Sequence, residues 1–292
     1  MSVPAAFIGV ILIWSTTPLA IQWSSAEAGF LYGVMARMLL GLLVCLLVLR
    51  VIGIPLCWHR EARRTYIAAG MGIYGAMTCV YWSAQYIPSG WIAVVFGLSP
   101  LLTSLLAFWW LGEGRLSLLR IAGLLTGVGG LLVMFGNGAT LGPDVAYGVL
   151  GVFLSVVLHS ISAVWVRAVG GNIPALAVTA GGLSIATPLF VLTWFIFDGQ
   201  WPVVLSERTR FSIVYLAVFG SVLGFFWYFY LLRKMEAAQV NLLTLITPVT
   251  ALLLGHWLNN EVLMPQIWFG VALITAGLFF YQWDLLQARR SG

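Results

Sequence analysis

The sequence is poor in charged residues and in cysteine. Asp, Glu, Lys and Arg together make up 8% of its 292 residues, whereas soluble domains carry about 25%. A chain with so little charge that is also 61% hydrophobic is expected to lie within a lipid bilayer. The three cysteines stand at unrelated spacings, which argues against a disulfide framework or a metal site.

The sequence also lacks the residue patterns of enzyme sites. It contains no zinc motif, no Ser-His-Asp arrangement and no pair of carboxylates within an apolar run. The glycine-rich segment 127–130 has no P-loop lysine and follows no strand, which argues against nucleotide binding. We therefore expect no catalytic residues, no metal and no cofactor.

Long apolar runs fill most of the chain. Each is about 20 residues long, which is the length of a helix that crosses the hydrocarbon core. None alternates polar and apolar residues as a membrane β-strand does. We predict an all-α polytopic membrane protein with ten transmembrane helices. The predicted spans are 4–23, 28–50, 64–87, 89–111, 116–136, 145–167, 174–197, 211–232, 237–258 and 264–284.

Basic residues gather on one side of the predicted spans. With a cytoplasmic N-terminus, eleven of the 14 Lys and Arg residues fall on the cytoplasmic side, Arg208 and Arg210 fall opposite, and Arg37 lies within a span. This asymmetry follows the positive-inside rule and predicts that both termini are cytoplasmic. The net charge of +5 then reflects membrane insertion, and we expect no nucleic-acid partner.

The segment 86–134 recurs at 234–280. The matched residues are Pro100 and Pro248, Trp109 and Trp257, Glu113 and Glu261, Gly123 and Gly270, and Gly130 and Gly277. An odd number of spans separates the two copies, so they must have opposite orientations in the membrane. The pattern predicts a first five-helix repeat at 1–136, a second, inverted repeat at 145–284 and a short cytoplasmic tail at 285–292. Inverted repeats are the architecture from which alternating access follows.

Several of these residues give the chain a family resemblance. It resembles the EamA type of the drug/metabolite transporter superfamily in Trp14-Ser15, in Arg37, and in the Pro, Trp and Glu series of the fourth and ninth spans. The resemblance implies that the chain exports or exchanges a small metabolite, such as an amino acid, across a bacterial-type inner membrane. It also implies a central cavity lined by spans one to four and six to nine.

The same resemblance implies that spans five and ten are peripheral, in a monomer or a homodimer. The second repeat departs from the pattern because Gly181 occupies the position that matches Arg37. Two alternatives belong to other functional classes. A membrane-embedded enzyme would need clustered acids, bases or metal ligands, and a scaffold or sensor would not need mirrored prolines.

Arg37 and His159 are the ionisable residues that lie deepest in the predicted spans. A charged side chain within the membrane is a candidate functional residue by default, and the Arg37 guanidinium suits a substrate carboxylate. Its structural alternative is to cap carbonyls freed by a helix break. His159 is the candidate proton carrier because its pKa lies near neutrality. Its alternative is a neutral ring that is hydrogen-bonded to Ser155, Ser162 or a backbone carbonyl.

Pro100 and Pro248 are expected to kink their helices and are candidate hinges, with a static kink as the alternative. Asn241 and Thr244 share one helix face with Pro248 and are candidate substrate contacts, with interhelical hydrogen bonding as the alternative. Aromatic residues on the cavity spans are further candidates, because they suit an apolar or cationic group, with packing as the alternative. They are Trp14, Tyr74, Tyr81, Trp82 and Trp165.

Overall fold

The computed structural model describes residues 2–112, 117–135, 144–169, 173–240, 243 and 246–290, and all regular secondary structure in these ranges is helical. The all-α prediction is thus confirmed. Six helical segments are long and apolar enough to cross a membrane: Val3–Ser25, Gly29–Ile52, Ser89–Leu111, Asp144–Val169, Ala175–Phe197 and Glu207–Lys234. The chain is therefore a multi-pass membrane protein.

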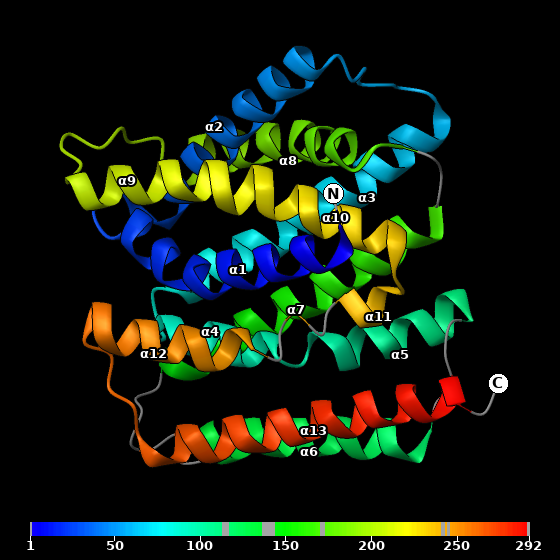
Figure 1. Cartoon of the computed structure of the whole chain (residues 1–292). Helices are drawn as coiled ribbons and strands as arrows, with labels where there is room; N and C mark the ends of the chain where they lie inside the picture. Colours follow the sequence, from blue (N-terminus) through cyan, green and yellow to red (C-terminus); the bar gives the residue numbers. More distant parts are fainter. Residues whose placement is uncertain are drawn as a thin grey trace.

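The helices follow one another in the order drawn in Figure 1. Their bounds are α1 Val3–Ser25, α2 Gly29–Ile52, α3 Arg60–Ser83, α4 Ser89–Phe96, α5 Ser99–Leu111, α6 Leu118–Phe135, α7 Asp144–Val169, α8 Ala175–Phe197, α9 Glu207–Tyr215, the π-helix η2 Leu216–Leu223, α10 Gly224–Lys234, α11 Ala237–Val240, α12 Thr247–Asn259 and α13 Pro265–Arg290. The last helix continues through most of the tail predicted at 285–292.

The predicted span 89–111 is two helices rather than one kinked helix. The break lies at Gly97 and Leu98, between α4 and α5. Pro100 falls in the first turn of α5, and Pro248 falls in the first turn of α12. A proline in the first turn gives up no helical hydrogen bond, because the N–H groups there have no partner within the helix. The two prolines therefore begin helices instead of kinking them.

Local sequence explains where several helices begin and end. Ser2 and Ser206 cap α1 and α9, because their hydroxyls accept from the backbone N–H groups of Ala5 and Thr209. Gly53, at φ 75°, ends α2 in the left-handed conformation that glycine adopts without strain. Asn260, at φ 53°, ends α12 in the same way.

The helices α6 and α13 form a pair at the bottom of Figure 1, largely apart from the other helices. A Cβ atom on Gly123 would lie 2.5 Å from the Gly277 carbonyl oxygen, and one on Gly130 would lie 2.7 Å from that of Gly270. The backbones of α6 and α13 therefore approach closely through small residues, as is common at helix contacts within membranes. Gly123 corresponds to Gly270 in the repeat, and Gly130 corresponds to Gly277. The contact between Gly123 and Gly277 is therefore equivalent to the contact between Gly270 and Gly130, as a two-fold axis between the helices requires.

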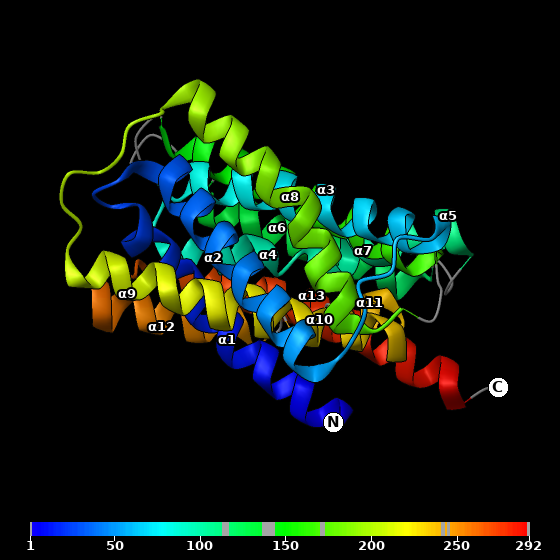
Figure 2. The ribbon, with the colours of Figure 1, turned by 90° about the horizontal axis from the view of Figure 1, so that it is seen from above.

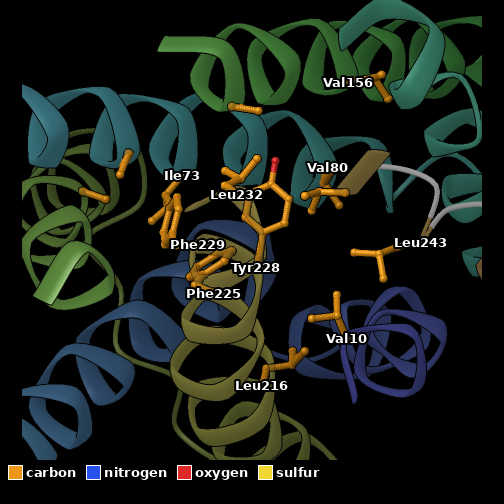
Figure 3. Close-up of a cluster of buried hydrophobic side chains, with 14 of the residues drawn as sticks. Val10, Ile73, Val80, Val156, Leu216, Phe225, Tyr228, Phe229, Leu232 and Leu243 are labelled. Atoms are coloured by element: carbon orange, nitrogen blue, oxygen red, sulfur yellow. The ribbon is translucent and has the colours of Figure 1, made fainter. Parts of the chain in front are cut away.

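The remaining helices pack into one bundle. From above, α2 and α8 run side by side, and α3 contacts both α7 and α8 (Figure 2). Phe225, Tyr228 and Phe229 of α10 extend toward Ile73 and Val80 of α3 (Figure 3). Phe225 is also part of the lining of a cavity, together with residues of α1 and α3.

Candidate solute-binding cavity

A cavity lies among α1, α2, α3, α4, α7, η2, α10 and α12. The space between its side chains totals about 630 Å³, part of it open to solvent. Its lining is mostly apolar, which is typical of small-molecule sites. The lining residues are Trp14, Thr17, Pro18, Ile21, Arg37, Met77, Val80, Ile92, Ala93, Phe96, His159, Gly220, Phe225 and Thr247.

Arg37 is the charged residue of this lining, and its side chain is 1% exposed. Its Nε donates to the Ser221 hydroxyl oxygen at 2.9 Å, and its Nη1 reaches the Tyr81 hydroxyl oxygen at 3.5 Å. The guanidinium carbon also lies 5.9 Å from the centre of the Tyr81 ring, within the range of a cation–π contact. These neutral partners fix where the guanidinium points and leave its charge unbalanced.

No carboxylate within the described ranges forms an ion pair with Arg37. The whole chain has nine Asp and Glu residues, and none of those that the structure describes lines the cavity. A buried charge without a counterion costs several kcal/mol, roughly, even after the protein relaxes. A ligand that brings an anionic group would offset this cost.

The π-helix η2 positions the Arg37 side chain. Residues Leu216–Leu223 form this helix within the longer run from α9 to α10, and π-helical turns are frequently found at functional sites. A Cβ atom on Gly220 would lie 2.8 Å from Arg37 Nη2, so the missing side chain leaves room for the guanidinium. Sequence reasoning did not predict the π-helix, and its only visible signal is the run of small residues Gly220-Ser221 near Gly224.

His159 of α7 lies among aromatic rings. Its ring centre is 5.7 Å from that of Trp14, 6.0 Å from Phe96 and 5.0 Å from Tyr228. The serines considered as partners use their own hydroxyl protons elsewhere. Ser155 donates to the Ala76 carbonyl at 2.8 Å, and Ser162 donates to the Ala68 carbonyl at 2.9 Å.

The structure brings Trp14, Arg37 and His159 together at the cavity, with Tyr81 behind the guanidinium. Three other predicted residues do not line it. The Tyr74 hydroxyl bonds to the Thr193 hydroxyl at 2.7 Å, and Trp82 packs on Tyr86. Trp165 lines a separate, more open pocket beside Glu61, Arg64 and Trp110. Asn241 and Thr244 lie outside the described residues.

Phe96, Phe225, Gly220 and Thr247 line the cavity without having been singled out from the sequence. Phe96, Phe225 and Gly220 lie in segments rich in similar apolar or small residues, and only the packing of helices distinguishes them from their neighbours. Thr247 differs, because it directly precedes Pro248 at the start of α12. A hydroxyl beside a helix start is a sequence signal that could have been used.

Comparison with known proteins identifies relatives over nearly the whole chain. The model of the EamA-like transporter family matches residues 2–136 and 146–282. The uncharacterized transporter YoaV of Bacillus subtilis (strain 168) is 23% identical over 96% of each chain. The uncharacterized inner membrane transporter YedA of Escherichia coli (strain K12) is 28% identical over 68% of this chain and 65% of its own.

A solved crystal structure of another protein has the same fold. It superimposes with a TM-score of 0.74 at 22% sequence identity and covers 99% of this chain and 98% of that one. At this level of identity the likeness concerns the arrangement of the helices and carries no information on the solute.

Proposed function

The chain belongs to the EamA-like transporter family, and we propose that it carries a small organic solute across the inner membrane by alternating access. Ten spans in two inverted halves would supply the two exchanging conformations. The helices beyond the six clear spans are then α3, α6, α11 with α12, and α13. The mirrored glycine contacts of α6 and α13 support this arrangement.

The orientation follows from the distribution of charge. Cytoplasmic N- and C-termini put most of the arginines on the cytoplasmic side, as the positive-inside rule requires. The inner-membrane transporter YedA is a relative of this chain, which supports the same location. The proposed direction is export or exchange, from the cavity toward the outside of the cell.

The observation that carries the choice of solute is the buried Arg37 guanidinium without a carboxylate partner among the described residues. A solute carboxylate would supply the missing anion, and its oxygens would accept charge-assisted hydrogen bonds, the stronger kind. The surrounding Trp14, Phe96 and Phe225 side chains suit an apolar body. The proposed solute is therefore an amino acid or a related small carboxylate.

The coupling proposed for this transport is proton antiport through His159. Imidazole is the side chain that exchanges a proton near neutral pH, and His159 shares the cavity with Arg37. Protonation would place a second positive charge in that apolar lining and would thereby oppose binding of the ammonium group of an amino acid, as antiport requires. Pro100 and Pro248 are the proposed bending points, because each lies in the first turn of its helix and Pro100 also follows the break at Gly97 and Leu98.

A ligand screen by thermal unfolding tests the proposal directly. A solute that binds the folded protein raises its melting temperature by mass action. We expect small carboxylates with an apolar body to stabilise the purified wild-type protein and to stabilise Arg37→Ala much less. The matching amines and primary amides, which lack the carboxylate, should stabilise neither protein. Equal stabilisation by the amides would contradict the proposed role of Arg37.

A further inference from the structure

Glu261, which follows α12, caps the N-terminus of a different helix. Its Oε1 accepts from the Ser89 backbone N–H at 3.0 Å and from the Ser89 hydroxyl at 2.6 Å, and its Oε2 accepts from the Gly90 N–H at 3.2 Å. The first N–H groups of a helix have no partner within it, and its dipole attracts negative charge there. Pro88 supplies no side-chain cap for α4. The carboxylate of Glu261 supplies it instead.

The backbone at the end of α12 directs the Glu261 carboxylate toward α4. Asn260 adopts φ 53°, and the backbone N–H of Glu261 returns to the Gly255 carbonyl at 3.1 Å. A Cβ atom on Gly255 would collide with Oε2 of Glu261. The glycine six residues earlier therefore leaves the space through which the Glu261 side chain reaches α4.

A second set of hydrogen bonds joins the same place to α1. The Asn259 amide donates to Glu261 Oε1 at 3.1 Å and to Gln22 Oε1 at 3.2 Å. The Gln22 amide in turn donates to the Ile87 carbonyl oxygen at 2.8 Å, just before α4. We call Gln22, Ser89, Gly90, Asn259 and Glu261 the latch. It connects the end of α1, the start of α4 and the end of α12.

The latch lies directly beyond one end of the cavity. Ile21 and Ile92 line the cavity, next to Gln22 on α1 and two residues past Gly90 on α4. In Figure 1 the C-terminal ends of α1 and α12 both lie at the left. A solute could leave the cavity at that end only if α1, α4 and α12 separated.

We propose that Glu261 is the gating residue of this end of the cavity, a role that rests on the proposed transport function. With its carboxylate on the N-terminus of α4, the latch holds the three helices together and the cavity is closed there. Release of Ser89 and Gly90 lets α4 move away and opens it. Glu261 is a positioning residue, since it acts through α4 and touches no solute.

Access of a thiol reagent to the cavity measures the state of this gate. The background replaces Cys45, Cys57 and Cys79 by alanine, and Ala93→Cys places one thiol in the cavity lining. A membrane-impermeant maleimide is added to sealed vesicles of each orientation. Loss of hydrogen bonds to a charged group shifts such an equilibrium by about tenfold or more. Glu261→Ala should raise the labelling rate by that factor when the maleimide is added on the latch side. It should lower the labelling rate when the maleimide is added on the opposite side.

Glu207→Gln is the matched control, because Glu207 is exposed near the same end of the bundle and belongs to no latch contact. It should leave both labelling rates unchanged. Glu261→Gln, which keeps one acceptor oxygen and loses the charge, should fall between the wild type and Glu261→Ala. Unchanged labelling from both ends in a folded Glu261→Ala protein would reduce Glu261 to a static cap and overturn the proposal.

A second variant covers the case in which Glu261→Ala does not fold. Gln22→Cys and Asn259→Cys, at hydrogen-bonded positions, are joined by a short, cleavable bifunctional thiol reagent in a protein that keeps Glu261. Formation of this cross-link should abolish the remaining labelling of Ala93→Cys by reagent added on the latch side. Cleavage of the cross-link should restore that labelling. Labelling that continues with the cross-link in place would refute the gate. Because labelling needs no solute, this result is independent of whether Arg37 binds a carboxylate.

Discussion

Arg37 of α2 and Ser221 of η2 are 184 positions apart in the sequence and are joined by a hydrogen bond of 2.9 Å from Nε to the hydroxyl oxygen. The bond ties the first half of the chain to the only π-helix within the described ranges. Beside it, the Gly220 backbone approaches the Nη2 atom. A single charged group thus reaches the cavity in an orientation that residues from both halves decide.

Replacing Arg37 separates its binding role from a structural one. Arg37→Ala should weaken binding of a carboxylate solute about tenfold to a hundredfold, because it removes hydrogen bonds between charged groups worth roughly 1.5–3 kcal/mol. The melting temperature without solute should stay level or rise, since an uncompensated buried charge is removed. Arg37→Lys keeps the charge but loses the planar fork and should recover binding only in part. A large loss of stability in Arg37→Ala would favour the structural alternative.

Gly220→Ala should act on the solute through Arg37. The added methyl group would lie 2.8 Å from Nη2, so the guanidinium must shift, at a cost of about 1–3 kcal/mol. We expect weaker carboxylate binding, measured by isothermal titration, along with a lower melting temperature. In Ser221→Ala, which loses the hydroxyl and adds no bulk, binding should weaken with a smaller stability change. Normal affinity in both variants would show that η2 does not position Arg37.

His159→Gln should uncouple transport from protons. Glutamine keeps a polar side chain but cannot titrate, so solute flux into proteoliposomes should no longer respond to a pH gradient. Flux driven by the solute gradient alone should continue. His59→Gln is the control, because His59 is exposed in the connection before α3. A pH response that survives in His159→Gln would assign the coupling to another group.

The α6 and α13 pair should depend on its glycines. In Gly277→Ala the new Cβ atom would collide with the Gly123 carbonyl oxygen and lie 3.1 Å from the Gly127 backbone nitrogen. Backbone atoms cannot rotate away as side chains do, so we expect a loss of about 1–3 kcal/mol and a lower melting temperature. Gly129→Ala, where nothing lies within 4 Å, should be neutral or stabilising.

Glu27 offers a prediction on pH outside the spans. Hydrogen bonds from the backbone N–H of Ser206, and then from its side chain, lower the pKa of Glu27 below its ordinary value of 4.5. A lowered pKa means that the contact adds stability above pH 4.5 and loses it as the pH falls through the lowered value. The melting temperature of the wild type should thus slightly exceed that of Glu27→Gln at pH 7. The difference should vanish in acid, and a constant difference would contradict the assignment.

Much of this architecture follows from the sequence. The apolar runs locate the helices, because a backbone in lipid must satisfy its hydrogen bonds within each segment. The repeated Gly123 and Gly270 identify a helix pair that packs closely, and Arg37 stands out because a charge in a span is costly. The family and the transporter class follow from the same patterns.

Only the tertiary structure decided which residues meet. The break at Gly97, the π-helix around Gly220 and the capping of α4 by Glu261 all depend on contacts between helices far apart in the chain. The spans are apolar on every side, so no alternation of polar and apolar residues marks the face that turns inward. Tyr74 and Tyr81 share a helix and a chemistry, yet only Tyr81 lies at Arg37. In a membrane protein, shape and close packing select the inward face, and these arise only when the helices assemble.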